Sequence, residues 1–292
     1  MDRREDVRDF LVSRRARISP EQAGLPSYGR RRVPGLRREE VASLAGVSID
    51  YYARLERGDL RGASDSILDA LADALRLDEA ERQHLNDLAR AAGPTRRSSR
   101  PPKRPTGTVR PAVAGILAGM TTIPAYVRTA GLDIVAANEL GAALFGPALA
   151  AESLPLNLAR FVFLDPRSVA LYLDWETIAD DLASSLRIES GRSPYDQALN
   201  ALIGELSARS DPFTQRWARH NVRIHTTATK RLHNPVIGDI ELTGNALQLS
   251  ADNLTMIVYT AEAGRQAEDQ LRLLATWSAT ARRSTEPAGD QK

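Results

Sequence analysis

The chain of 292 residues contains 42% apolar residues, no cysteine, and 39 basic against 37 acidic side chains. This is the composition of an ordinary soluble protein with room for two domains, and the lack of cysteine excludes disulfides and thiolate metal sites, which fits the cytoplasm. No run approaches the roughly 20 apolar residues of a membrane span, and no apolar segment follows the charged start of the chain, so we expect neither a membrane anchor nor a signal peptide.

The charge is unevenly distributed along the chain. Residues 1–105 contain 22 basic and 17 acidic side chains, whereas residues 106–292 contain 17 and 20. The positive excess gathers at Arg30, Arg31, Arg32, Arg37 and Arg38. A solvated basic surface would show such a run, but beside a DNA-binding motif the neutralisation of phosphates is the better interpretation.

The first elements in chain order predict a helical domain. A helix is expected from Arg3 to Arg17, followed by a loop over residues 18–36, which are punctuated by proline and glycine. Residues 37–58 then show two short helical patterns around Gly46-Val47-Ser48. This is the layout of a helix-turn-helix, whose second helix presents its N-terminus to the major groove of DNA.

Local chemistry supports both helices of this motif. Gly46 can take the positive φ that ends the first helix, and Ser48 can cap the second helix by accepting a backbone N–H. Gly58 offers a stop to the second helix. Helical spacing indicates a buried face that is formed by Val41, Leu44, Ala45, Tyr52 and Leu55.

The DNA contacts are predicted from the remaining positions of the motif. Side chains near the N-terminus of the second helix reach base edges in such motifs, and here they are Ile49, Asp50, Tyr51 and Arg54. For Arg54 the alternative is a surface ion pair with Asp50 at i,i+4. Glu56 is expected to support the fold, because phosphates would repel it. The other predicted contacts, mainly to phosphates, are Arg37, Arg38, Ser48, Arg57 and Arg61.

Two further helices complete this domain, and a linker follows. Ser64 or Asp65 can cap a helix that continues to about Leu75, and the next helix opens at Asp78–Glu81 and ends near Ala92. Residues 94–105 contain four prolines, five basic residues and no other apolar side chain, which predicts a flexible linker. We therefore expect a DNA-binding domain at 1–93, a linker at 94–107, a second domain at 108–280 and a disordered tail at 281–292.

The second domain mixes helices and strands. A helix at Ala112–Met120 precedes a hairpin, and Asn138 is expected to hydrogen-bond the backbone where the hairpin ends. Residues 166–220 are mainly helical, and a closing helix runs from Gln266 to about Ser278. The predicted strands are Tyr126–Thr129, Leu132–Ala136, Lys230–His233, Ile237–Leu242, Ala246–Leu249 and Leu254–Thr260.

This order of elements is typical of a PAS-like sensor, in which an antiparallel sheet and its helices enclose a ligand. The predicted fold class is α+β, with an all-α five-helix helix-turn-helix domain followed by the PAS-like domain. Aromatic residues could line an apolar pocket, with ordinary core packing as the alternative for each, and Arg160 or Arg223 could anchor a carboxylate head group. The aromatic candidates are Tyr126, Phe161, Phe163, Trp175 and Trp217.

No enzyme or cofactor motif accompanies this domain. The chain has no nucleophile elbow, phosphate-binding glycine loop or dinucleotide fingerprint, so we expect no cofactor. The four histidines, His84, His220, His225 and His233, lack the spacing of a helical metal pair, so we expect no metal site.

A family resemblance covers nearly the whole chain. Residues 30–58 resemble the xenobiotic-response-element class of repressors and, more closely, the MmyB-like transcription regulators. Many relatives of the wider class begin the first motif helix with Gln where Arg38 stands. Arginine at this position can still contact a phosphate, but it cannot make the specific contact of a glutamine amide. The chain is similar to that family's C-terminal ligand-binding domain at Thr122-Ile-Pro-Ala-Tyr-Val127, Asn157-Leu-Ala-Arg160, Asp174-Trp-Glu176, Trp217-Ala-Arg-His-Asn-Val222 and Val258-Tyr-Thr-Ala261.

Residues and resemblance together predict a sequence-specific, one-component transcription regulator that is not an enzyme. Its expected partners are a double-stranded DNA operator, a second copy of the chain in a homodimer, and a small, largely apolar ligand of the fatty-acyl or another elongated type, but no membrane. Ligand binding would shift the dimer between states of different DNA affinity. The alternatives are a DNA-tethered enzyme acting on a small metabolite and a purely structural dimerisation domain.

Overall fold

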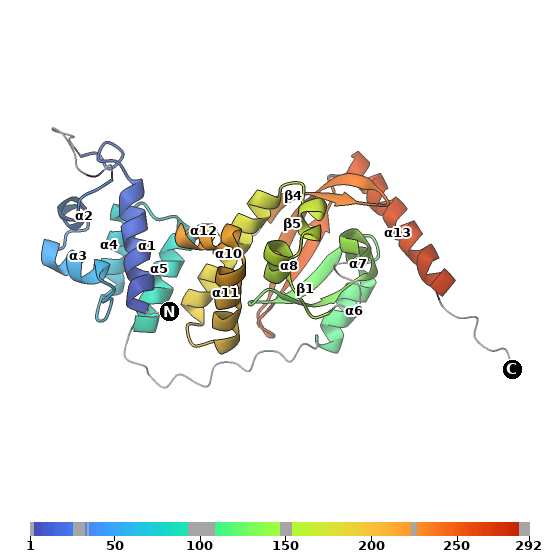
Figure 1. The fold of residues 1–292 in the computed structure, drawn as a ribbon, viewed down its shortest axis with the longest axis horizontal. Helices are drawn as coiled ribbons and strands as arrows, with labels where there is room; N and C mark the ends of the chain where they lie inside the picture. Colours follow the sequence, from blue (N-terminus) through green and yellow to red (C-terminus); the bar gives the residue numbers. More distant parts are fainter. Residues whose placement is uncertain are drawn as a thin grey trace. The chain divides into compact units, whose positions relative to one another are not determined.

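The computed structural model describes residues 3–25, 33, 35–92, 109–146, 154–222 and 227–285. The chain forms two compact units, and Figure 1 labels most of their helices and strands. The first unit combines Met1–Pro101 with Arg187–Gly204 and Thr214–Ile224, and the second combines Pro102–Leu186 with Glu205–Phe213 and His225–Lys292. The predicted linker at 94–107 lies outside the described residues.

Five helices build the N-terminal part of the first unit, as predicted. Ser48 and Ser64 cap the third and fourth of them by accepting the backbone N–H groups of Tyr51 and Ile67. Gly46 has a φ of +65° and ends the second helix. The helices are α1 (Arg3–Arg17), α2 (Arg38–Leu44), α3 (Ile49–Glu56), α4 (Asp65–Ala74) and α5 (Glu79–Ala92).

The apolar core of this unit recruits residues from far along the chain. Phe10 of α1, Tyr52 of α3 and Leu71 of α4 are buried in one cluster, which also contains Ile188 and Val222. Both Ile188 and Val222 lie within residues 108–280, the range predicted for the second domain. The difference arises because helical spacing shows that a residue is buried but does not show which core it joins.

Leu44 is an exception to the predicted buried face of the motif. Its side chain is 38% exposed, whereas Val41, Ala42 and Ala45 are buried. At about 100° per residue, these three positions lie within one arc of the helix, and position 44 lies about 60° outside it. The short helix α2 therefore buries the arc that carries Val41, Ala42 and Ala45, and Leu44 lies outside this arc, on its exposed side.

The second unit is built on an antiparallel sheet. Its described strands are arranged in the order β3-β2-β1-β6-β5-β4. The two predicted strands at 237–242 and 246–249 are one strand, because Gly244 and Asn245 continue the ladder by pairing with Tyr259 and Val258. The strands are β1 (Ala125–Thr129), β2 (Asp133–Ala137), β3 (Leu156–Asn157), β4 (Thr227–Asn234), β5 (Gly238–Leu249) and β6 (Leu254–Thr260).

Helices accompany this sheet, and three of them, α10 to α12, contribute residues to both units. The closing helix is longer than predicted: it runs to Thr285, so the expectation of a disordered tail from residue 281 is wrong for residues 281–285. Alanine and arginine at 281–283 favour continuation of the helix. The helices are α6 (Pro111–Gly119), α7 (Glu139–Phe145), α8 (Leu158–Leu164), α9 (Arg167–Leu171), α10 (Trp175–Arg192), α11 (Gln197–Arg209), α12 (Asp211–Ala218) and α13 (Gln266–Thr285).

Asn138 fixes the connection between the hairpin and α7. Its side-chain oxygen accepts the backbone N–H groups of Ala125 at 2.9 Å and Gly141 at 2.8 Å. Its side-chain nitrogen donates to the carbonyl oxygens of Met120 at 2.6 Å and Ile123 at 2.7 Å. One amide that is 7% exposed thus satisfies four backbone groups where the chain leaves the sheet.

The alternation of side chains divides the sheet into two faces. On one face, Val127 of β1 and Met256 of β6 pack in an apolar cluster with Val113 and Leu117 of α6. The other face carries Tyr126, Arg128, Ile257 and Tyr259, and the register extends it to Lys230, because Lys230 pairs with Leu242 and Gly244 pairs with Tyr259. We call this second face, which combines two tyrosines with an arginine and a lysine, the tyrosine face.

Candidate DNA-binding and ligand-binding sites

The recognition helix α3 presents its N-terminal residues to solvent. Ser48, Ile49 and Asp50 are exposed, and the apolar side chain of Ile49 is 53% exposed. Tyr51 is half-buried, and the guanidinium carbon of Arg54 lies 4.7 Å from the centroid of its ring. Arg54 therefore stacks on Tyr51, and within the described residues it forms no ion pair with Asp50, the alternative that the sequence offered.

Glu56 binds three elements of the motif together. Its carboxylate is 1% exposed and accepts a hydrogen bond from Arg15 of α1 at 2.6 Å, and it also pairs with Arg38 at the start of α2. The Tyr52 hydroxyl donates to the same carboxylate at 3.4 Å. Burial first, and then the negative charge of Glu56, raise the pKa of Tyr52. One buried carboxylate thus links α1, α2 and α3.

The arginines predicted to bind phosphates lie around this helix. Arg38 is 56% exposed although it pairs with Glu56, and the exposed Arg61 pairs with Asp59 at 2.9 Å. Arg37 lies 3.3 Å from Glu39, and Arg57 is exposed at the end of α3. Phosphates would compete with acidic partners for Arg37, Arg38 and Arg61. Arg30, Arg31 and Arg32 lie outside the described residues.

In the second unit, the predicted aromatic residues fall into separate clusters. Tyr126 contacts Phe145 and Tyr259, with ring centroids 5.7 and 6.1 Å apart. Phe163 contacts Trp175 and Phe213 at 6.2 and 5.1 Å. The Trp175 indole donates to the carbonyl of Val162 at 3.2 Å, which is typical of a packed core. Phe161 is buried as well.

Two predicted ligand residues have other roles. Trp217 belongs to the first unit, where the guanidinium carbon of Arg187 lies 3.8 Å from its ring centroid. Arg160 is 47% exposed and pairs with Glu205 at 2.8 Å, so it is not an unpaired cation at an interior pocket. Its partner lies 45 positions away in the chain, which is why the sequence did not reveal the pair. Arg223 lies outside the described residues.

The tyrosine face instead gathers polar groups that the sequence analysis did not select, apart from Tyr126. Tyr126, Tyr172 and Tyr259 are at most 2% exposed, and Tyr172 joins this face through a bridge to Leu232 of β4, two residues from Lys230. The Tyr259 hydroxyl lies near that of Tyr126 but has no partner with hydrogen-bond geometry among the described residues. The ammonium of Lys230 on β4 lies 6.0 Å from the centroid of the Tyr259 ring.

Electrostatics set Lys230 apart from the other bases of this domain. Burial lowers its pKa from 10.5 to about 8, with Asp181 opposing this change and Arg128 adding to it. No described carboxylate lies within ion-pair distance of Lys230. Burial also raises the pKa values of Tyr126, Tyr172 and Tyr259, so the three phenols stay protonated and can donate hydrogen bonds.

Comparison with protein-family models identifies both parts of the chain. Residues 109–274 match the model described as the MmyB-like transcription regulator ligand binding domain, and residues 12–85 match a helix-turn-helix domain. The chain belongs to the family of MmyB-like transcription regulators. No curated protein matched the chain in a separate comparison.

This MmyB-like transcription regulator combines a DNA-binding helix-turn-helix domain, which includes α2 and α3, with a ligand-binding domain, which includes the tyrosine face. The predicted α+β class is confirmed, with a helical helix-turn-helix region and an antiparallel sheet with helices. None of the described helices is both long and apolar enough to span a bilayer. Within the same residues, no three side chains of His, Asp or Glu converge as metal ligands would.

The sequence of this MmyB-like regulator contained one signal for Lys230, which was not among the predicted ligand residues. The chain has only three lysines, and Lys230 is the only one between the linker and the C-terminal end. Arginine keeps its charge almost everywhere, whereas lysine shifts its pKa readily when buried. A lone lysine in a strand of a domain that otherwise uses arginine was therefore a candidate for an interior cation.

Proposed function

We propose that this protein is a one-component transcription regulator whose second domain binds a small, largely apolar ligand with an acidic head group, of the fatty-acyl type, at the tyrosine face. The main support for this proposal is the environment of Lys230. Lys230 is half-buried, and removing an ammonium from water even in part is costly unless an anion lies beside it; none of the described carboxylates pairs with it. A ligand carboxylate would supply the missing negative charge, and the tyrosine hydroxyls can donate hydrogen bonds to it.

The surroundings of Lys230 suit the remainder of such a ligand. Ile257 and Leu242 lie on the same face of the sheet, and Phe145 packs against Tyr259 with ring centroids 5.4 Å apart. Ligand sites are mostly apolar and carry few polar groups, which fix the orientation of the ligand. This assignment replaces Arg160 as the anchor of the acid, because Arg160 is paired with Glu205.

A thermal-shift titration of the full chain tests the ligand class. We expect fatty acids of graded chain length to raise the melting temperature, and the matched fatty alcohols to raise it much less. Lys230→Met should remove the preference for the acid, whereas Lys230→Arg should keep part of it. Equal shifts for acids and alcohols, or an unchanged preference in Lys230→Met, would contradict the proposed anchor.

We further propose that α3 recognises DNA bases and that two copies of the chain form a homodimer. Ile49, Asp50 and Tyr51 at the N-terminus of α3 would contact bases, together with Arg54 in its last turn. The exposed arginines would contact phosphates. Two half-sites on DNA require two motifs, and α13 presents Leu273 and Trp277, which are 56% and 48% exposed one helical turn apart. These two residues favour α13 as a contact between copies.

Light scattering on the full chain tests the dimer. We expect a mass of twice the chain's 31.9 kDa and a shift towards the monomer in Trp277→Glu. Ala279→Glu adds the same charge on the opposite side of α13 and serves as the matched control. A monomeric wild-type protein at micromolar concentration, in the presence and absence of DNA, would refute the homodimer.

A further inference from the structure

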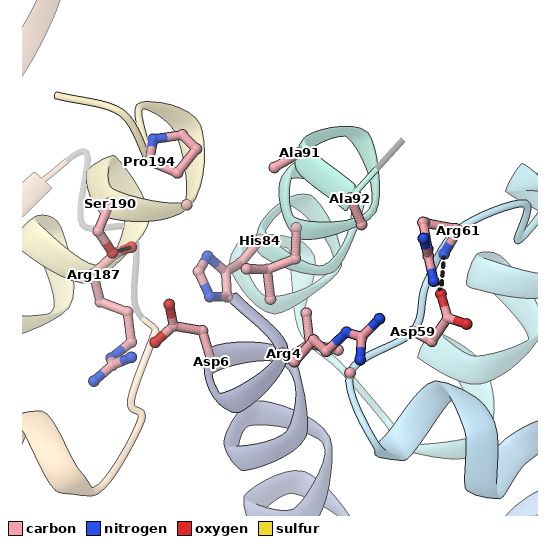
Figure 2. A pocket seen from close by; sticks show the side chains of 14 residues that line it. Arg4, Asp6, Asp59, Arg61, His84, Ala91, Ala92, Arg187, Ser190 and Pro194 are labelled. Carbon is pink, nitrogen blue, oxygen red and sulfur yellow. Dashed lines mark hydrogen bonds and ion pairs between the residues drawn. The ribbon is translucent and has the colours of Figure 1, made fainter. Parts of the chain in front are cut away.

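A pocket of about 260 Å³ lies within the first unit, in the part of the protein that carries the DNA-binding motif. Its walls come from α1, from the loop after α3, from α5, and from the end of α10 with the turn that follows. Figure 2 shows Asp6, His84 and Arg187 turned towards one another, with Arg61 hydrogen-bonded to Asp59 in another part of the lining. Its volume is below the roughly 300–1,000 Å³ of sites for drug-sized ligands, so its occupant must be small.

The lining has an apolar part and a cationic part. Val7, Leu88 and Ala92 supply apolar surface, and Arg4, Arg61 and Arg187 supply guanidinium groups. Two carboxylates, Asp6 and Asp59, oppose these three cations, so the lining has one cation in excess. Asp59 is occupied by Arg61 at 2.9 Å, and burial raises the pKa of Asp6 although Arg187 lowers it. The pocket is therefore electropositive beside an apolar wall.

His84 brings an unused polar atom to this pocket. Its side chain is 4% exposed, and its Nδ1 has no hydrogen-bond partner among the described residues. Burial, followed by the charges of Arg187 and Arg14, lowers the pKa of His84 to about 3, so the imidazole is neutral near pH 7. A neutral imidazole can carry its proton on Nδ1 and donate it to an anion.

Gly191 allows α10 to lie close to the imidazole of His84. A Cβ atom at this position would lie 2.9 Å from both Nδ1 and Cε1 of His84, closer than ordinary van der Waals contact allows. Gly191 lines the pocket, and it lies within α10, where alanine would otherwise be the better helix former. Glycine at this position therefore lets the backbone of α10 pack against the imidazole edge, and a larger residue would displace the His84 ring within the pocket lining.

We propose that this pocket is a second binding site, separate from the tyrosine face, for a small organic carboxylate with an apolar body. The carboxylate would accept a hydrogen bond from Nδ1 of His84 and interact with the guanidinium groups of the lining, and the apolar body would contact Val7 and Leu88. A benzoate-sized molecule matches the volume and the division between apolar and cationic walls.

The site also reaches the DNA-binding surface. Arg61 lines the pocket and is one of the predicted phosphate contacts. A bound carboxylate would reduce the positive potential beside the recognition helix, so it would weaken DNA binding without touching a base. We expect saturating benzoate to lower the affinity for a duplex of random sequence severalfold at low salt. Equal affinities with and without benzoate would overturn this coupling.

Imidazole ¹H–¹⁵N spectra of the full chain test the site directly. The chain has four histidines, so single substitutions can assign each resonance. We expect benzoate to move the His84 resonances saturably, while benzamide and benzylamine do not. His233, which is exposed and lies 2.6 Å from Asp239, serves as the internal reference. The proposal is overturned if the His84 resonances stay fixed or respond equally to benzylamine.

Two matched glycine variants connect this response to the pocket. Gly191→Ala should abolish the benzoate response, because the added methyl group would displace the His84 ring within the pocket lining. Gly204→Ala on α11 should preserve it, because nothing lies within 4 Å of its added Cβ. Ala92→Phe, which fills the opposite wall, provides a second block if Gly191→Ala does not fold. An unchanged benzoate response of His84 in these blocking variants would refute the site. A benzoate response of His84 that persists in Lys230→Met would show that this site is separate from the tyrosine face.

Discussion

Replacing Lys230 by methionine should stabilise the ligand-free protein. The pKa of Lys230 falls from 10.5 to about 8 on folding, mainly through burial. Below pH 8 the lysine is protonated in both the folded and the unfolded state, so the folded state bears the full cost of enclosing the charge. A shift of this size corresponds to at most about 3 kcal/mol, and the partial exposure of Lys230 to solvent reduces it.

The pH dependence of this gain has a definite sign. As the pH rises through 8, the folded protein releases the proton, and the penalty shrinks until it vanishes near pH 10.5, where the unfolded chain also loses it. Lys230→Met should therefore gain about 1–3 kcal/mol at pH 7 and almost nothing at pH 10.5. Lys230→Arg retains a charge, so it should show no such gain.

Urea unfolding of the full chain at several pH values measures the stability difference. The pKa itself is accessible by NMR of reductively ¹³C-methylated lysines, since the chain has only three lysines to assign. The measured value can be compared with the ordinary lysine pKa of about 10.4. A titration midpoint of Lys230 near 10.4, or a loss of stability in Lys230→Met at pH 7, would refute the reasoning. Such a result would also remove the main support for an acidic ligand at the tyrosine face.

Three further predictions concern the motif and the hairpin. Arg54→Ala should relax specificity at one base pair by about 1–3 kcal/mol, whereas Arg38→Ala should weaken all sequences alike and flatten the salt dependence; titrations of duplex variants distinguish these outcomes. Glu56→Gln should cost about 2–4 kcal/mol in urea unfolding, because it leaves Arg15 without its carboxylate, and a change below 0.5 kcal/mol would contradict this role. Asn138→Ala should cost about 2–4 kcal/mol, since four backbone groups lose their partner, and a neutral result would show that water replaces the amide.

The sequence by itself determined most secondary structure and the helix-turn-helix. Those features depend on signals that act within one or two helical turns: Ser48 caps α3, Gly46 supplies a positive φ, and the apolar spacing of α3 buries Tyr52 and Leu55. One prediction from helical spacing alone, the burial of Leu44, was wrong. Leu44 has the spacing of a core residue but lies outside the buried arc of a seven-residue helix.

Only the tertiary structure decided which distant side chains meet. Arg15 and Glu56 are 41 positions apart, and Arg160 and Glu205 are 45 positions apart, so no periodic pattern connects them. Strand register placed Lys230 on the same face as Tyr259, and a shift of one residue would have turned it to the opposite face. Spacing along the chain fixes the face of an element on which a residue lies, whereas its partners depend on how the elements pack.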